Sequence, residues 1–211
     1  MSLGPGDSAA AKQRRIPKGD LRKAAIIKAA MTIFARDGFA GASLSNVAKV
    51  AGLSTVGLLH HFPNKLALLQ AVLKHRDEYV TRRLREADQD ATLESFMSFL
   101  KLVFEFSIED ASVSQALIII NAESLSVTHP ANLWFCERFN IVHAHLNDHI
   151  TRLVQAGEIR ADVDVKQVAL EVVSMMDGMQ IQWLRSSCTL QIEAGFTRFL
   201  QRLELDLTRH L

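Results

Sequence analysis

This 211-residue sequence has only two cysteines and no long apolar run. Its longest strictly apolar runs, such as residues 116–120, are far shorter than the about 20 residues that span a membrane. The first 20 residues contain no apolar core, so we expect no signal peptide. The two cysteines, Cys136 and Cys188, lie far apart and favour two inert thiols over a disulfide framework. We therefore expect a cytoplasmic protein without a membrane partner.

Motifs of enzyme active sites are also missing. The sequence contains no Gly-rich phosphate loop, no HExxH and no GxSxG. No stretch has the pattern of a β-strand. With 48% hydrophobic and 22% charged residues, the composition is typical of a globular protein. We therefore expect an all-α protein that is not an enzyme and holds no cofactor, although an all-helical enzyme is kept as an alternative.

Charge is distributed unevenly, although the net charge is only +1. Residues 1–65 hold ten Lys or Arg against three Asp or Glu, a balance of +7, whereas the remainder holds fourteen against twenty, a balance of −6. Such an asymmetry suggests a basic module for a polyanion joined to an acidic module with another task. Nucleic acid is the first candidate for the polyanion.

Helical patterns divide the chain into four parts. We expect a flexible basic arm over residues 1–19, a three-helix DNA-binding domain over 20–66, a connecting helix over 67–90, and a larger helical domain over 91–211. In the second part, residues 21–36 repeat apolar side chains at helical spacing and stop near Gly38. Ser43 and Ser54 are placed to cap two further short helices, and Gly52 lies in the turn between them. Two short helices joined in this way form a helix-turn-helix.

The last of these helices, predicted over residues 55–62, has two distinct sides. Leu58 and Phe62 lie one turn apart and are expected to face the preceding helices. Gly57 is a poor helix former, so we consider two reasons for it: tight packing against a neighbouring helix, or close approach of its backbone to DNA. The opposite side is expected to meet the major groove; it carries Thr55, Val56, Leu59 and His60.

The segment GFAGASLSNVAKVAGLSTVGLLHHFPNKLALLQAV resembles the DNA-binding domain of the TetR family of transcriptional regulators, with matching spacing from about residue 21 to residue 72. The resemblance implies an N-terminal helix-turn-helix and a larger helical domain for ligand binding and dimerisation. One residue departs from the family pattern, because Leu59 stands where the family usually has tyrosine. Leu59 could instead contact a thymine methyl group.

DNA contacts are expected along the helix-turn-helix. Adjacent His60 and His61 point about 100° apart, so they are expected to contact DNA rather than bind a metal. The resemblance implies a phosphate contact for Lys65, and a solvated lysine is the alternative. Arg14, Arg15 and Lys18 of the arm either enter the minor groove or remain solvated. The predicted DNA-binding residues are Ser43, Ser54, Thr55, Val56, Gly57, Leu59, His60, His61 and Lys65.

Wide apolar stripes mark the two C-terminal helices, predicted over residues 165–185 and 190–209. A two-fold four-helix interface would bury them, and the resemblance implies a homodimer at this place. An ordinary intramolecular core is the alternative. The predicted dimer-interface residues are Val172, Met179, Ile192, Phe196, Phe199 and Leu203.

The resemblance also implies a dimeric repressor that binds a palindromic double-stranded operator and is released from it by an unknown small-molecule effector. Its predicted pocket residues are Phe104, Asn121, Trp134, Phe135, His143, Met176, Gln180 and Trp183, and plain core packing is the alternative for each. Two other kinds of regulator are kept as alternatives. One is a DNA-binding protein that needs no ligand, and the other is a metal-responsive regulator that uses His143, His145 and His149, although we expect no metal site.

Overall fold

The computed structural model describes residues 18–84 and 92–209, and every element in these two ranges is a helix. The expected all-α fold is therefore confirmed. Predictions for Arg14 and Arg15, and for the start of the effector domain at residue 91, lie outside the described residues. The helices are α1 Lys18–Gly41, α2 Leu44–Val50, α3 Thr55–Leu59, α4 Lys65–Leu84, α5 Leu93–Ile108, α6 Ala111–Glu123, α7 Asn132–Ala156, α8 Val165–Arg185 and α9 Ile192–Thr208.

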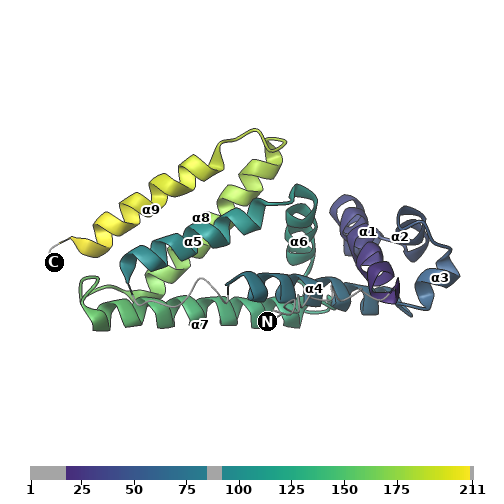
Figure 1. Cartoon of the computed structure of the whole chain (residues 1–211), viewed down its shortest axis with the longest axis horizontal. Helices are drawn as coiled ribbons and strands as arrows, with labels where there is room; N and C mark the ends of the chain where they lie inside the picture. The colour runs from purple at the N-terminus through teal and green to yellow at the C-terminus, as the bar shows by residue number, and fades with distance from the viewer. Residues whose placement is uncertain (1–17, 85–91, 210–211) are drawn as a thin grey trace, which may run out of the picture.

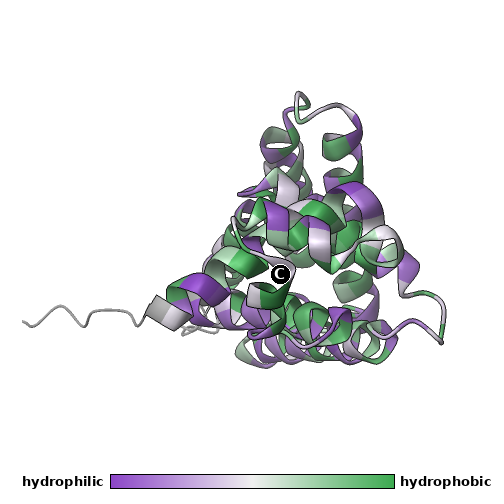
Figure 2. Ribbon diagram, turned by 90° about the vertical axis from the view of Figure 1, so that its right-hand side faces the viewer, coloured by the Kyte–Doolittle hydropathy of each residue, from purple (hydrophilic) through white to green (hydrophobic). Residues whose placement is uncertain are grey.

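The helices are arranged along an elongated molecule (Figure 1). Helices α1, α2 and α3 form one end, and α5, α8 and α9 pack together toward the other, with α7 running beneath them. Helix α6 stands between the two groups. Figure 2 shows that hydrophobic and hydrophilic residues alternate around the helices, as amphipathic packing requires. None of the described helices is both long enough and apolar enough to cross a lipid bilayer.

Local sequence explains most helix ends. Ser43, Ser54 and Asp164 cap α2, α3 and α8 by accepting bonds from backbone N–H groups one turn ahead. Gly157 ends α7 in the left-handed conformation, with φ 73°. The predicted end of the first helix at Gly38 is instead a kink: φ is 68° and ψ 177° there, and helical backbone resumes up to Gly41.

Two hydrophobic clusters form the core. The first joins α1, α2, α3 and α4, and it also includes Ala116 and Ile120 of α6. The second joins α5, α7, α8 and α9. The contact between α1 and α6 is the most extensive of the described helix pairs, and the Gln115 side-chain amide of α6 donates to the Ala35 carbonyl of α1 at 3.0 Å. Helix α6 therefore shares a core with the N-terminal helices, although it lies in the C-terminal half of the sequence.

Candidate functional site

The short helix α3 is held by its cap and by two buried side chains. Ser54 Oγ accepts a hydrogen bond from the Gly57 N–H at 3.0 Å. Leu58 and Phe62 are 0% and 6% exposed within the N-terminal cluster, so the predicted inward face of this segment is confirmed. The structure ends α3 at Leu59 and makes His60 its C-cap, rather than continuing the helix to Phe62.

The outward face of α3 carries apolar side chains that the fold leaves uncovered. Val56 is 66% exposed and Leu59 is 39% exposed, and Thr55 and His60 are also exposed. His61 is half-buried. A face of this kind can reach base edges and thymine methyl groups. Helix α3 lies at one end of the molecule (Figure 1), and Leu58 anchors its opposite side in the core.

Gly57 lies beside its own cap rather than against a neighbouring helix. A Cβ added there would be 3.3 Å from Ser54 Oγ, and no other atom of the described residues would come within 4 Å. Of the two reasons considered for this glycine, packing against another helix is therefore not supported. Open space in front of the Gly57 backbone leaves room for close approach of a ligand.

Lys65 is placed differently from the prediction. Its ammonium group donates three hydrogen bonds, to the carbonyls of Phe39 at 2.8 Å, Ala40 at 3.0 Å and Ala42 at 3.0 Å. It also lies 4.7 Å from the centroid of the Phe39 ring. A lysine has three N–H donors, so none is left for a phosphate in this conformation. We therefore replace the expected phosphate contact by a structural one that ties α4 to the end of α1.

A cavity of about 290 Å³ opens among α4, α5, α6, α7 and α8. Its walls are mainly apolar, as in most small-molecule sites. Six of the eight predicted pocket residues line it, and they come from three helices: Asn121, Trp134, Phe135, His143, Met176 and Gln180.

The other two predicted pocket residues lie elsewhere. Phe104 is 1% exposed and stacks on Phe196 with ring centroids 4.1 Å apart, so it belongs to the second hydrophobic cluster. Trp183 is half-buried against the same cluster and does not line the cavity. Both assignments were wrong because an apolar position on a helix does not indicate which neighbouring space it fills.

Charged residues of the cavity were missed. Arg76, Arg138 and Asp177 line it together with the apolar side chains. The Arg138 guanidinium pairs with Asp77 Oδ1, and Trp134 Nε1 donates to Asp77 Oδ2 at 3.0 Å. Burial raises the pKa of the Asp177 carboxyl, and nearby His143 opposes this shift only in part. A sequence signal existed for one of them, because Arg76 continues the helical stripe of buried residues 68, 69, 72 and 73.

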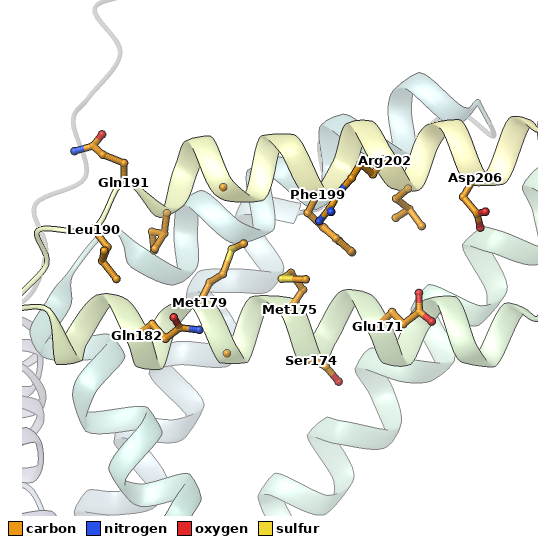
Figure 3. Close-up of a pocket in the computed structure, with 14 residues that line it drawn as sticks. Glu171, Ser174, Met175, Met179, Gln182, Leu190, Gln191, Phe199, Arg202 and Asp206 are labelled. Carbon is orange, nitrogen blue, oxygen red and sulfur yellow. The ribbon is translucent and has the colours of Figure 1, made fainter.

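A second hollow, of about 900 Å³, runs between α8 and α9 (Figure 3). Met175 and Met179 of α8 point toward Phe199 of α9 across this space. Glu171 and Arg202 border it with charged side chains. The hollow is therefore a groove with an apolar floor and polar edges.

Most of the predicted dimer stripe lies inside the protomer. Val172 and Phe196 are 0% and 1% exposed, so an intersubunit role for these two residues is corrected to a core role. Ile192, Phe199 and Leu203 are also buried, but like Met179 they line the groove. Apolar side chains that remain exposed on or next to these two helices are Leu170, Ile181, Leu190 and Leu205.

The histidines of α7 do not form a metal cluster. His145 and His149 have ring centroids 6.4 Å apart, and His149 is fully buried against Phe96 and Phe99. No group of three His, Cys, Asp or Glu able to hold a metal ion occurs within residues 18–84 and 92–209. Cys136 and Cys188 are free and exposed.

Comparison with known proteins supports the family resemblance of the N-terminal helices. Residues 26–72 match the family model described as bacterial regulatory proteins, tetR family. The HTH-type transcriptional regulator BetI of Vibrio parahaemolyticus is 28% identical over 195 residues, which cover 89% of this chain and 92% of BetI. RutR of Escherichia coli K12, also an HTH-type transcriptional regulator, is 36% identical over 87 residues, or 41% of each chain.

Solved structures agree in fold over most of the chain. A TetR-family transcriptional regulator from Agrobacterium tumefaciens has a TM-score of 0.73 at 17% identity and covers 90% of this chain and 100% of its own. The transcriptional regulator FadR of Bacillus subtilis, solved in complex with stearoyl-CoA, has a TM-score of 0.70 at 21% identity, with 87% and 97% covered. The capped helix-turn-helix therefore lies within the residues that match the tetR family model, and the fold of the chain is similar to that of a solved TetR-family regulator over most of its length.

Proposed function

We propose that this regulator binds a palindromic operator as a homodimer, acts as a repressor in the cytoplasm, and is released by a small molecule that enters the cavity among α4 to α8. The observation that carries the proposal is the uncovered outer face of α3, on which Val56 and Leu59 are exposed beside Thr55 and His60. Exposed apolar side chains beside polar ones can contact thymine methyl groups and base edges in the major groove.

The positions proposed to read DNA are Thr55, Val56, Leu59 and His60, and His61 is a further candidate. The backbone of Gly57 offers close approach, and the caps Ser43 and Ser54 present helix N-termini that suit a phosphate. Arg14, Arg15 and Lys18 remain proposed minor-groove contacts. Two recognition helices about 34 Å apart would then contact successive turns of one face of the duplex.

Dimerisation is proposed through the outer faces of α8 and α9. The groove between them has an apolar floor, and the exposed Leu170, Ile181 and Leu205 lie on the same two helices. Packing a second copy there by a two-fold axis would cover these side chains with their own equivalents. Ile192, Phe199 and Leu203 would then support the interface from beneath rather than form it alone.

The cavity supports a ligand-responsive regulator over one that acts without a ligand, because a constitutive protein has no need for an unfilled space among five helices. Its ligand must bind the released form more tightly than the operator-bound form, since equal affinity would shift no equilibrium. Helices α4 and α6 both line the cavity and both belong to the N-terminal cluster, so a ligand can act on the position of that cluster.

Fluorescence anisotropy with the DNA upstream of the protein's own gene tests this function. We compare the wild type with Thr55→Ala/His60→Ala across a salt series, and use Thr151→Ala/Gln155→Ala on α7 as a matched double change far from α3. Specific binding that weakens roughly 10- to 100-fold only in the α3 variant is expected, because one good base contact contributes about 1–3 kcal/mol. Equal binding by both variants would show that another surface reads DNA.

A further inference from the structure

Arg76 is the basic group of the cavity wall that has no ion-pair partner within the described residues. Its guanidinium lies 5.8 Å from the centroid of the Tyr79 ring, and it forms no hydrogen bond or ion pair within the described residues. The residue is half-buried on the core-facing stripe of α4. Burial and the positive charge of Arg138 both lower the pKa of Arg76, which means that the surroundings disfavour its charge. An arginine remains charged even so, and such a group calls for an anion.

The carboxylates nearest to Arg76 are already engaged by other residues. Asp77 accepts from Arg138 and from Trp134, one bond on each of its oxygens. Arg76 also lines a neighbouring hollow between α1, α4, α5 and α6, and Glu109 of that hollow accepts from the Tyr79 hydroxyl. Each of these acids attracts Arg76 only from a distance. The donors of Arg76 are therefore not used by these acids, and the residue lies on the wall between the cavity and the neighbouring hollow.

The other charged residues of the cavity wall are Arg138 and Asp177. The charge of Arg138 is paired with that of Asp77, so only Asp177 could oppose Arg76 there. Asp177 is exposed to solvent, yet the surrounding protein still disfavours its ionised form and raises its pKa. His143 adds a buried ring nitrogen, Nε2, that has no hydrogen-bond partner in the described structure. The cavity can therefore accept one negative charge at the Arg76 end and a polar group near His143.

The size and walls of the cavity restrict the rest of the ligand. Its volume of about 290 Å³ lies at the small end of ligand pockets, which span about 300–1,000 Å³. Phe106, Leu117, Trp134 and Phe139 supply flat and branched apolar surface. In this conformation the space suits a single ring or a short branched chain rather than a long acyl chain.

We propose that the effector is a compact organic carboxylate, whose anionic group binds Arg76 in a two-pronged hydrogen-bonded pair and whose apolar body lies against Trp134 and Phe139. A planar carboxylate matches the fixed fork of a guanidinium better than any neutral group does. This assignment rests on the proposed function of the cavity as the effector site, and it adds the chemical class of the effector.

Trp134 provides a direct signal for the test. The protein has two tryptophans, and Trp183 does not line the cavity, so Trp183→Phe leaves one reporter at the site. In this background we titrate benzoate and 3-phenylpropanoate, and compare them with the neutral benzamide and 3-phenylpropanamide of nearly equal shape. We expect the acids to change Trp134 fluorescence and raise the melting temperature, and to bind at least about tenfold more tightly than the amides.

Variants locate the charge that is responsible. Arg76→Met is expected to weaken the acids about 10- to 100-fold and leave the amides unchanged, because it removes a charge-assisted pair only. Arg76→Lys keeps the charge without the fork and is expected to fall between the two. Lys74→Met is the matched control, since Lys74 lies on the same helix with its side chain 77% exposed, and it is expected to change nothing. Circular dichroism checks that each variant is folded.

Three results overturn the proposal: amides that bind as tightly as the acids, an unchanged preference for acids in Arg76→Met, or no binding of either acid in the millimolar range. Operator binding is measured on the same samples, so that the two proposals fail separately. Acids that bind at Arg76 without weakening operator binding support the ligand class and overturn its role as an effector. Loss of all specific operator binding in the wild type overturns the proposed function and leaves the binding result at Arg76 standing.

Discussion

The backbone N–H of Phe39 donates a hydrogen bond of 2.8 Å to Glu123 Oε2, across 84 positions of sequence. Phe39 follows the kink at Gly38 near the end of α1, and Glu123 is the last residue of α6. The same Phe39 carbonyl receives the Lys65 ammonium of α4. One turn of backbone thus joins the DNA-binding end of the protein to two helices that line the cavity.

Removal of this carboxylate tests how much the contact contributes. Glu123→Ala leaves the Phe39 N–H without its acceptor, and we expect a loss of about 1–2 kcal/mol in the free energy of unfolding, since the carboxylate is partly exposed. Glu123→Gln keeps an acceptor oxygen and is expected to lose less. Urea unfolding measures both variants. An equal loss in the two would mean that the charge of Glu123, and not its hydrogen bond, stabilises this turn.

Gly38 is expected to tolerate no side chain. A Cβ there would overlap Glu123 Oε1, and φ 68° is a left-handed conformation that costs an L-residue roughly 1–2 kcal/mol. Gly38→Ala is therefore expected to lower the unfolding midpoint in the wild type and by less in Glu123→Ala, because the second variant removes the overlap. Gly19, where a Cβ meets nothing, gives the matched Gly→Ala control.

Two measurements together decide whether Lys65 stabilises the fold or contacts a DNA phosphate: the free energy of unfolding and the salt dependence of operator affinity. Lys65→Met removes three hydrogen bonds to carbonyls and is expected to cost roughly 1–3 kcal/mol of stability. Because its donors are used within the protein, the slope of operator affinity against salt concentration is expected to stay the same. A slope reduced by about one would instead reveal a phosphate contact. Lys49→Met, at an exposed position of α2, is the control for stability.

Two variants of α9 distinguish a residue of the protomer core from a residue of the proposed dimer interface. Phe196→Ala removes a buried ring stacked on Phe104 and should cost about 3–5 kcal/mol of stability. Leu205→Glu changes a side chain that is 67% exposed, so helix content should persist while sedimentation shifts from dimer toward monomer. A Leu205→Glu protein that stays dimeric at low micromolar concentration would place the interface elsewhere.

Asp177 gives a pH dependence with a defined sign. Its pKa is raised in the folded protein, chiefly by burial, so the folded state holds this proton more tightly than the unfolded state does. Stability from this group is therefore full below the unfolded pKa of about 4 and is lost as pH rises through the folded value. Asp177→Asn removes the effect, so we expect it to be more stable than the wild type at neutral pH and to lose this advantage in acid. Urea midpoints across pH would contradict this if the two curves stayed parallel.

The sequence predicted those features that local chemistry determines. Ser43 and Ser54 were recognised as caps because a cap depends on one side chain and the turn that follows it. The inward position of Leu58 followed in the same way from helical spacing. Features that depend on residues far away in the sequence were harder to predict. The spacing of Phe196 shows that one face of α9 is apolar, but it does not show whether a second copy or α5 covers that face.

Lys65 and Arg76 illustrate the same difference for charged residues. Lys65 was assigned to DNA from the family pattern, but its partners are carbonyls about 25 positions earlier in the chain. Arg76 was overlooked because it lies in a charged stretch, and its place in the apolar stripe of α4 became meaningful only beside the cavity. In both cases the sequence showed that a positive charge is present, but it did not show which groups that charge contacts.

The shared core of α6 and the N-terminal helices has a practical consequence for building chimeric regulators. An N-terminal fragment that ends after α3, or even after α4, would expose the apolar surface of α1 that Ala116 and Ile120 cover in the whole protein. We expect such a fragment to aggregate when it is fused to the ligand-binding domain of another protein. The fusion would have to include α6, or a helix of the same shape in its place. Exchange of sensing modules between relatives should therefore be planned around a unit that is discontinuous in sequence.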